Sequence, residues 1–337
     1  MKKVSYLLLA GLLATTFACK KEVKVDDSKD QPTHQLVADD VAAELYGGMK
    51  EGAFAEMYAE NTHELTQRFY VSANDPFTVI AEGGTRVISP DNNFTNLEGD
   101  MIDGEIMIEI IEVRDRGTMV ALDKGTMGVT EDEDGISALI SDGEIFVRAT
   151  QGGEEVINID PLKVVVPVDA IDPDMMRFNE LEGTGDDLVW ELAEDPELGE
   201  EEIEGEGGGV GTSYEILPGE WGWTNIDKFF NDPCPKTTIH VEVPAGHDDT
   251  NTEVYLAYVG EPGALANFDV WDGSRFTEHY GQICIGIDVH FIAVTNVGGG
   301  LEYGIHSTTI VNGHVEVFTG FTPISQSALT ALINGLP

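Results

Sequence analysis

Two long stretches of this chain alternate apolar and polar residues with a period of two, and this pattern limits the fold more than any other feature. The first stretch runs from about residue 68 to residue 168, and EIMIEIIEV places Ile106, Ile108 and Ile110 on one face. The second runs from about residue 221 to residue 322 and contains TTIHVEV and EVYLAYV. Successive side chains of a strand point to opposite faces, so these runs predict strands. Frequent Gly, Asp and Asn turns between them favour a β-sandwich.

The alternating stretches predict an all-β fold with two β-sandwich domains in tandem. We expect the first domain at residues 68–190, with TRVIS, TMVAL and VVVPV among its short strands. The second is expected at residues 214–337, and an amphipathic Ala/Leu pattern at 325–334 predicts that it ends in a short helix. Residues 191–213 are acidic, then glycine-rich, and carry few core-forming side chains, so they predict a flexible linker between the domains.

Residues 1–18 are typical of a bacterial secretion signal that ends before a lipoprotein cysteine. Lys2 and Lys3 precede 15 almost wholly apolar residues, too few to span a bilayer as a permanent helix. Cys19 is therefore expected to carry the lipid, and two or more acyl chains make such an anchor effectively permanent. No other stretch is apolar and long enough to cross a membrane.

The residues after Cys19 predict a tether and then a short helical segment. Residues 19–36 are polar and lack periodicity, whereas residues 37–67 carry helical spacing that Gly47 and Gly48 interrupt. The lysines and acid directly after Cys19 resemble the export tag of Bacteroidetes lipoproteins. We therefore expect an outer-membrane lipoprotein that faces the cell exterior, with the periplasmic side as the alternative.

The charge of the chain narrows the choice of partners. It has 62 acidic and 18 basic residues, for a formal net charge of −44. Such a surface repels phosphate backbones and anionic headgroups, which excludes nucleic acid and peripheral membrane binding as functions. The acidic residues serve either as a solvated surface in a saline exterior or, in part, as ligands for divalent cations.

Two cysteines besides Cys19 are available for a disulfide. In an oxidising compartment Cys234 and Cys284 can close a loop of 50 residues. However, Cys284 takes the strand face opposite to Ile283 and Ile285, so two free thiols are the alternative. We expect the disulfide.

Two short motifs resemble metal sites, and each lacks essential ligands. The run that starts at His63 and Glu64 has Gln67 where a zinc-protease helix needs its second histidine. In residues 130–135, Asp132 and Asp134 occupy positions of a calcium loop. The loop's first and last acidic ligands are replaced by Thr130 and Ser141, so we expect a hairpin turn there, with calcium as the weaker alternative.

No catalytic residue is identified. The chain has no nucleophile elbow, Walker loop, dinucleotide fingerprint or Cys/His metal spacing. His247, Asp248 and Asp249 lie in a polar loop and are expected to form a solvated turn. Trp271 is the candidate for ligand binding, because an exposed tryptophan can stack on a sugar ring; packing in a domain core is the alternative.

Two segments resemble a lipoprotein family that is widespread in Bacteroidetes. The first carries Gly84, Thr85, Pro90, Phe94, Gly99, Gly104 and Glu112, and it continues to Ser141, Gly143, Ala149 and Thr150. This region is similar to the ZU-type β domains of ankyrins and netrin receptors, and the resemblance implies a role in protein contacts without catalysis. The second segment, GWTNIDKF at residues 222–229, resembles a Gly-Trp-Ile-Asn-Cys-Asp-Arg-Phe signature. In the family that signature opens a second β domain; this chain has Ile226 where cysteine is common.

The sequence therefore predicts a lipid-anchored, non-catalytic module that acts in structure or in protein interaction. The alternatives are a carbohydrate- or calcium-dependent module for polysaccharide capture and a hydrolase with a dispersed active site. No cofactor is expected, with calcium the one exception, and the membrane is expected to be contacted through the lipid. The protein or glycan partner is not specified by the sequence.

Overall fold

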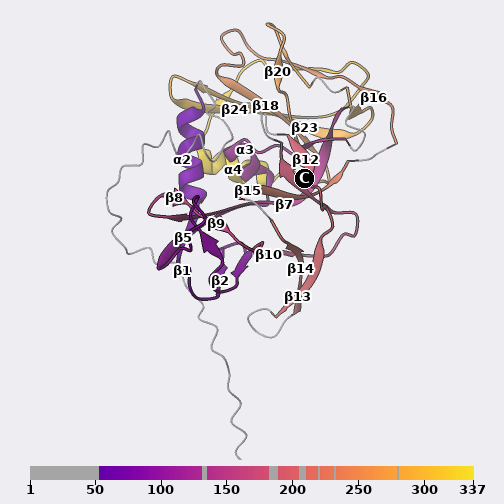
Figure 1. The fold of residues 1–337 in the computed structure, drawn as a ribbon. Helices are drawn as coiled ribbons and strands as arrows, with labels where there is room; N and C mark the ends of the chain where they lie inside the picture. Colours follow the sequence, from indigo (N-terminus) through magenta and orange to yellow (C-terminus); the bar gives the residue numbers. More distant parts are fainter. Residues whose placement is uncertain are drawn as a thin grey trace, which may run out of the picture.

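The structure, a computed structural model, describes residues 53–130, 135–181, 189–204, 210–218, 221–230, 233–278 and 281–337. In this part of the chain strands predominate and three helices accompany them, which confirms the predicted all-β class (Figure 1). Cys19, the signal, the tether and the first half of the predicted helical segment lie outside the described residues. No described helix has the length and apolar character needed to cross a bilayer.

The largest sheet contains most of the first half of the chain. Its strand order is β1-β5-β7-β15-β11-β12-β6, and β8 also pairs with β7. The strands are β1 (Gln67–Ser72), β5 (Glu105–Val113), β6 (Met127–Val129), β7 (Ile136–Gln151), β8 (Glu154–Glu155), β11 (Met176–Glu180), β12 (Trp190–Leu192) and β15 (Gly222–Phe229).

One part of this sheet closes on itself. β7 has 16 residues, and its first three pair with β6 while residues 144–150 pair with β5 along the same edge. Its other edge pairs with β15, and the pairs β15–β11, β11–β12 and β12–β6 complete the circuit. We call β7, β15, β11, β12 and β6 the strand ring. Closure removes the open edges that a sheet of this size would otherwise expose.

A second sheet faces the outer side of the ring. Its order is β13 (Gly199–Glu204), β14 (Val210–Ile216), β10 (Lys163–Val168), β3 (Arg86–Ser89) and β2 (Phe77–Ile80). A single core cluster joins Ile108 of β5 and Ile145 of β7 to Val87 and Val164 of this sheet. A short ribbon of β4 (Phe94–Thr95) and β9 (Ile157–Asn158) packs Phe94 into the same core.

The second half of the chain forms its own layers around another core cluster. One sheet has the order β19-β18-β23-β24-β26 and a smaller one the order β20-β21-β17-β25, while β16 and β22 form a separate pair. The strands are β16 (Lys236–Thr237), β17 (His240–Glu242), β18 (Thr252–Tyr258), β19 (Leu265–Asn267), β20 (Val270–Trp271), β21 (Phe276–Thr277), β22 (Ile283–Cys284), β23 (Asp288–Val297), β24 (Gly300–Thr309), β25 (Val315–Val317) and β26 (Thr322–Pro323).

The helices are α2 (Ala55–Leu65), α3 (Arg116–Leu122) and α4 (Gln326–Asn334). Helix α4 confirms the predicted C-terminal helix, and the Ser325 hydroxyl caps its first turn by accepting a hydrogen bond from the Ala328 N–H. The prediction of a strand at TMVAL is wrong, because these residues form α3. Asp115 caps its start and Asp123 ends it in the left-handed region. Nearly every side of this short helix is buried, so its sequence shows no polar face from which helical periodicity could be read.

The helices join the two halves of the molecule through a shared core. Leu329 and Ile333 of α4 belong to the same cluster as Met119 of α3 and Ile292 of β23. The close approach of α3 and α4 depends on Gly117, where an added Cβ would lie 2.5 Å from the Thr330 carbonyl oxygen.

The predicted linker at residues 191–213 is wrong where the structure describes it. β13 and β14 are paired strands of the second sheet, and β15, expected to open the second domain, lies in the strand ring. Acidic composition misled the prediction because an edge hairpin tolerates charge on its open side. Lys163 of β10 compensates part of that charge, since its Nζ lies 2.7 Å from Glu201 and 2.6 Å from Glu215.

Because one core joins the two halves, we expect Leu329→Ala to destabilise the whole molecule. The side chain is 1% exposed, and truncation of a buried leucine costs about 2–5 kcal/mol. Urea unfolding followed by tryptophan fluorescence should show one transition at a lower midpoint. Leu332→Ala on the same helix, where the side chain is 38% exposed, is the matched control and should change little. Two separate transitions in the unsubstituted protein would contradict the shared core.

Candidate functional site

The clearest candidate interface is an apolar patch on the outward face of the β4–β9 ribbon. Leu97 is 69%, Met101 54%, Ile157 43% and Ile159 53% exposed. Thr95 pairs with both Ile157 and Met101, so Ile157 and Met101 share one face. Leu97 lies in the turn between Thr95 and Met101, and Ile159 follows Ile157 by two residues. We call Leu97, Met101, Ile157 and Ile159 the ribbon patch. Large apolar side chains gathered at this exposure are typical of contact sites.

The ribbon patch rests on a rigid support. The Asn96 side-chain oxygen accepts hydrogen bonds from the backbone N–H groups of Glu98 (3.1 Å) and Asp100 (2.8 Å), which fixes the turn that carries Leu97. On the other side, the Asn93 amide exchanges hydrogen bonds of 2.9 and 2.8 Å with the backbone of Asp160. A surface held in this way loses little conformational entropy when it binds.

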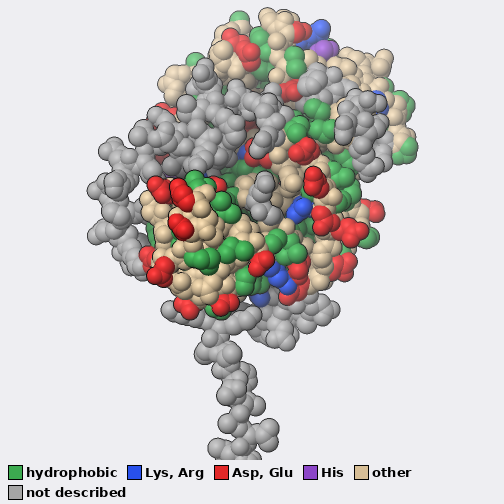
Figure 2. Space-filling view, viewed as in Figure 1, with side chains coloured by type: hydrophobic (Ala, Val, Ile, Leu, Met, Phe, Trp, Pro, Cys, Tyr) green, Lys and Arg blue, Asp and Glu red, His purple; other side chains and the backbone are tan. Residues whose placement is uncertain are grey.

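Acidic residues surround the ribbon patch. Residues 87–113 and 151–162, which carry it, contain no lysine or arginine. Exposed carboxylates lie beside the apolar side chains along the chain, at Asp91, Glu98, Asp100, Asp103 and Asp160. Figure 2 shows acidic side chains scattered over this view of the molecule and far fewer basic ones. The patch therefore offers an apolar centre with a negative rim.

Glu112, one of the residues that carry the family resemblance, supports the turn between β2 and β3. Its carboxylate accepts hydrogen bonds from the N–H groups of Gly83 (2.6 Å) and Thr85 (3.1 Å), and Arg114 donates to the same carboxylate at 3.4 Å. A Cβ at residue 83 would lie 2.7 Å from this carboxylate. These contacts of Glu112 hold the β2–β3 turn in place, and none of them indicates catalysis.

A second unusual cluster lies inside the strand ring. Glu144 on β7 and Asn225 on β15 are directly opposite each other, and Asp227 faces Ser141 two pairs further along, beyond a bulge at Asp142. Glu144, Asn225 and Asp227 are 0% exposed. The Ser141 hydroxyl donates to the Asn225 oxygen (2.7 Å), and the Asn225 amide donates to Asp227 Oδ2 (2.6 Å).

The two carboxylates of this cluster are under-satisfied. Both oxygens of Glu144 and Oδ1 of Asp227 are buried and accept no hydrogen bond in the described part of the chain. Burial raises the pKa of Glu144 well above its usual value; Asp227 raises it further, and Lys124 opposes the shift. Burial likewise raises the pKa of Asp227 well above its usual value. The sequence analysis did not identify this cluster. Its local signal is Asp227, the acidic residue of the TNIDK segment.

An open cleft of about 620 Å³ lies where the two halves of the molecule meet. Phe229 and Phe230 line one side, and Tyr258 and Ile287 line the other. The acids Asp174, Glu261 and Asp288 also line it, together with Lys228, which pairs with Asp172 at 2.6 Å. No pair of a nucleophile and a general base lines this cleft among the described residues.

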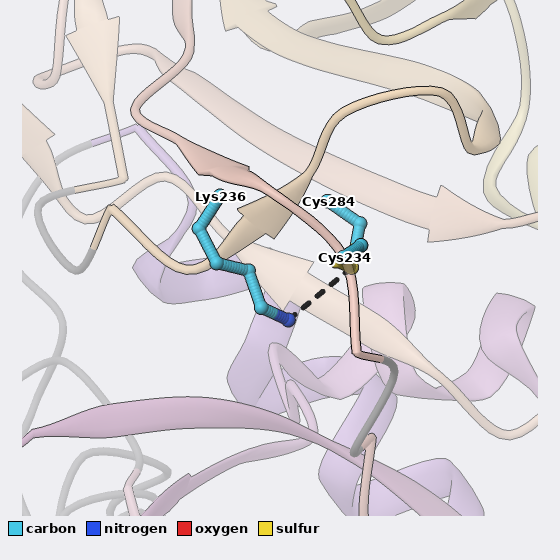
Figure 3. Close-up of a disulfide and its surroundings, with 3 residues drawn as sticks. All are labelled: Cys234, Lys236 and Cys284. Atoms are coloured by element: carbon cyan, nitrogen blue, oxygen red, sulfur yellow. Dashed lines mark hydrogen bonds between the residues drawn. A yellow bond between two sulfur atoms is a disulfide. The ribbon is translucent and has the colours of Figure 1, made fainter.

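The structure places Cys234 and Cys284 in a disulfide, with their Cα atoms 5.5 Å apart. Figure 3 shows Lys236 directed toward this bridge, and its Nζ lies 3.2 Å from the Cys284 sulfur. The bridge links the start of the second half to β22, just after the cleft-lining Pro233. It fixes the chain where it leaves the strand ring.

The remaining predicted residues are found apart from one another. Trp271 is half-buried and packs on Phe276, with ring centroids 4.8 Å apart and an angle of 53° between the rings. His247 contacts the Thr295 hydroxyl at 3.0 Å, and Asp248 caps the turn at Thr250. His63 lies in the last turn of α2.

Asp132 and Asp134, the acids of the predicted calcium loop, lie outside the described residues. On either side of the predicted turn, β6 and β7 pair antiparallel, with Val129 opposite Ile136. Among the described residues, no group of three or more His, Cys, Asp or Glu side chains is arranged to hold a metal ion.

Comparison with known proteins adds no family to this description. Neither a protein-family model nor a curated protein matches the chain. The function must therefore be argued from the geometry alone.

The buried carboxylates predict an unusual pH dependence of stability in metal-free buffer. Glu144 has its pKa raised in the folded state, so its contribution is fully favourable below the unfolded value of 4.5 and is lost as pH rises toward the folded pKa. Glu144→Gln should therefore raise the free energy of unfolding at pH 7, by about 1–3 kcal/mol, and flatten its decline above pH 4.5.

Chemical unfolding at a series of pH values with a chelator present measures this effect. Glu98→Gln removes an exposed carboxylate of the same type and is the matched control. Equal pH profiles for the two variants would contradict the interpretation of Glu144.

Proposed function

We propose that this chain is a lipid-anchored outer-membrane lipoprotein that acts as a non-catalytic protein-interaction module, with the ribbon patch as its contact surface. The observation that carries this proposal is the patch itself: four large apolar side chains, 43–69% exposed, on a turn and ribbon fixed by asparagine side chains. Selection for solubility disfavours such a surface unless a partner covers it.

The rim of the ribbon patch defines the chemistry of the partner. Carboxylates without any neighbouring lysine or arginine in the same segments favour a protein whose contact surface has an apolar centre and a basic rim. A second copy of this chain would bring its own acidic rim, at a net charge of −44 per copy, so self-association is disfavoured. An anionic lipid surface is disfavoured for the same reason.

The non-catalytic part of the proposal is supported by the positions of the candidate catalytic side chains. Among the described candidates, His247 contacts the Thr295 hydroxyl and packs on Phe321, and Asp248 caps a turn. His63 lies exposed in the last turn of α2. In this proposal the lipid on Cys19 anchors the protein, and the tether of residues 19–36 lets the module extend from the membrane.

Site-specific crosslinking tests the contact surface. A photoreactive amino acid in place of Leu97 or Ile157, in cells that produce the full chain, should give a defined adduct. Val311, which is 58% exposed between β24 and β25 in the second half of the chain, is the control position and should give none. The adduct should weaken when Asp100→Lys is added, because the rim charge is reversed.

The partner recovered in the adduct must then bind the purified chain with an affinity that falls as salt rises. Adducts of equal yield at residues 97 and 311, or a partner whose binding is indifferent to Asp100→Lys and to salt, would contradict the proposal.

The anchor is tested separately with Cys19→Ser. We expect the variant in the soluble fraction, because the lipid supplies the stable membrane attachment. Fractionation of cell envelopes with antibody detection measures the shift, and Cys234→Ser is a control that leaves residue 19 intact. Equal envelope retention of the Cys19→Ser variant would contradict lipid anchoring without affecting the ribbon patch.

A further inference from the structure

We propose that the inside of the strand ring is a binding site for one hard divalent cation of the calcium class. The ligands are oxygens of Glu144, Asp227, Asn225 and Ser141, which β7 and β15 bring to one face at the Asp142 bulge. This site is distinct from the ribbon patch and from the acidic turn of residues 130–135, and it does not depend on the proposed function.

The proposed site contains buried carboxylate oxygens that accept no hydrogen bond. Glu144 Oε1 and Oε2 and Asp227 Oδ1 accept no hydrogen bond from any described residue, although both side chains are 0% exposed. Burial of a carboxylate without compensation costs several kcal/mol, and a folded protein avoids that cost by protonation or by pairing with a cation.

The ionisable side chains at the proposed site carry an excess of negative charge. Glu144, Asp227, Glu180 and Lys124 interact around the ring interior. Asp142 also interacts with Asp227, so the carboxylates of this cluster outnumber the Lys124 ammonium. The Lys124 ammonium lies 3.9 Å from Glu180 and 4.6 Å from the centre of the Trp223 ring. A divalent cation would offset this excess of negative charge.

The available ligand atoms are all oxygens, which suit a hard cation. Carboxylate, amide and hydroxyl oxygens are hard ligands that calcium prefers over the nitrogen and sulfur donors chosen by zinc or copper. Glu144 offers two oxygens and Asp227 one, while Asn225 and Ser141 add neutral oxygens that now bind each other. The set holds two acidic ligands and two neutral ones.

Terbium luminescence tests this site, because terbium replaces calcium at oxygen sites and is excited by nearby tryptophan. Trp223 is two residues from Asn225 on the same face of β15. The chelator-treated full-length chain should give sensitised emission that calcium displaces, and calcium should raise its melting temperature. Calcium titrations should extend to about 10 mM, above the range of weak extracellular sites.

Glu144→Gln and Asp227→Asn should each weaken terbium affinity at least about tenfold, since fewer charged ligands remain. They should also abolish the calcium-dependent rise in melting temperature. Glu98→Gln, which removes an exposed acid, should behave like the unsubstituted chain. If a ring variant fails to fold, Ser141→Ala, which removes a neutral ligand only, gives the same test with a smaller loss of affinity.

Two results would overturn the proposal. One is the absence of sensitised emission from the folded, unsubstituted chain throughout the titration. The other is emission, or calcium stabilisation, of equal strength in the ring variants, which would place the ion on the acidic surface. Either result, together with greater stability of Glu144→Gln than of the unsubstituted chain, would indicate that Glu144 and Asp227 share a proton.

Discussion

The pairing of β7 along both of its edges is the constraint on which the rest of the structure depends. This strand is 16 residues long and has β15 on one edge and β6 followed by β5 on the other. It therefore belongs at once to the strand ring and to the layer that packs against the second sheet. A shorter strand could not do both, because a strand residue advances only about 3.3 Å.

Closure of the ring also explains why its inside can hold polar side chains. Phe146, Phe178, Trp190 and Trp223 exclude water from the interior, and Glu144 and Asp227 are placed among them by strand register. A one-residue shift in register would move both acids to the opposite face. Register is fixed by the hydrophobic outer face, where Ile145 and Ile226 meet the second sheet. The buried acids are thus held in place by packing they do not themselves provide.

Local pattern was enough to predict much of the fold. Period-two alternation identified the β5 and β7 strands, and the Ala/Leu pattern at residues 325–334 identified α4. Local pattern gave wrong predictions where contacts between distant parts of the chain decide the secondary structure. TMVAL became a helix because Asp115 caps it and its neighbours bury it, and the acidic stretch after Glu191 became an edge hairpin because Lys163 lies beside it. The site was harder still, since the ribbon patch and the ring cluster unite residues from separate strands that no single window of sequence contains.

The packing of α4 on α3 has a consequence for how the molecule is made. The Gly117 N–H donates to the Asn334 side chain across 217 residues of chain. Contacts of such long range are slow to form, since a large loop must close before any energy is gained. The nascent polypeptide cannot complete its central core until residue 334 has been delivered. During that interval the apolar surface of α3 is uncovered, which favours a chaperone that holds the chain until its last helix arrives.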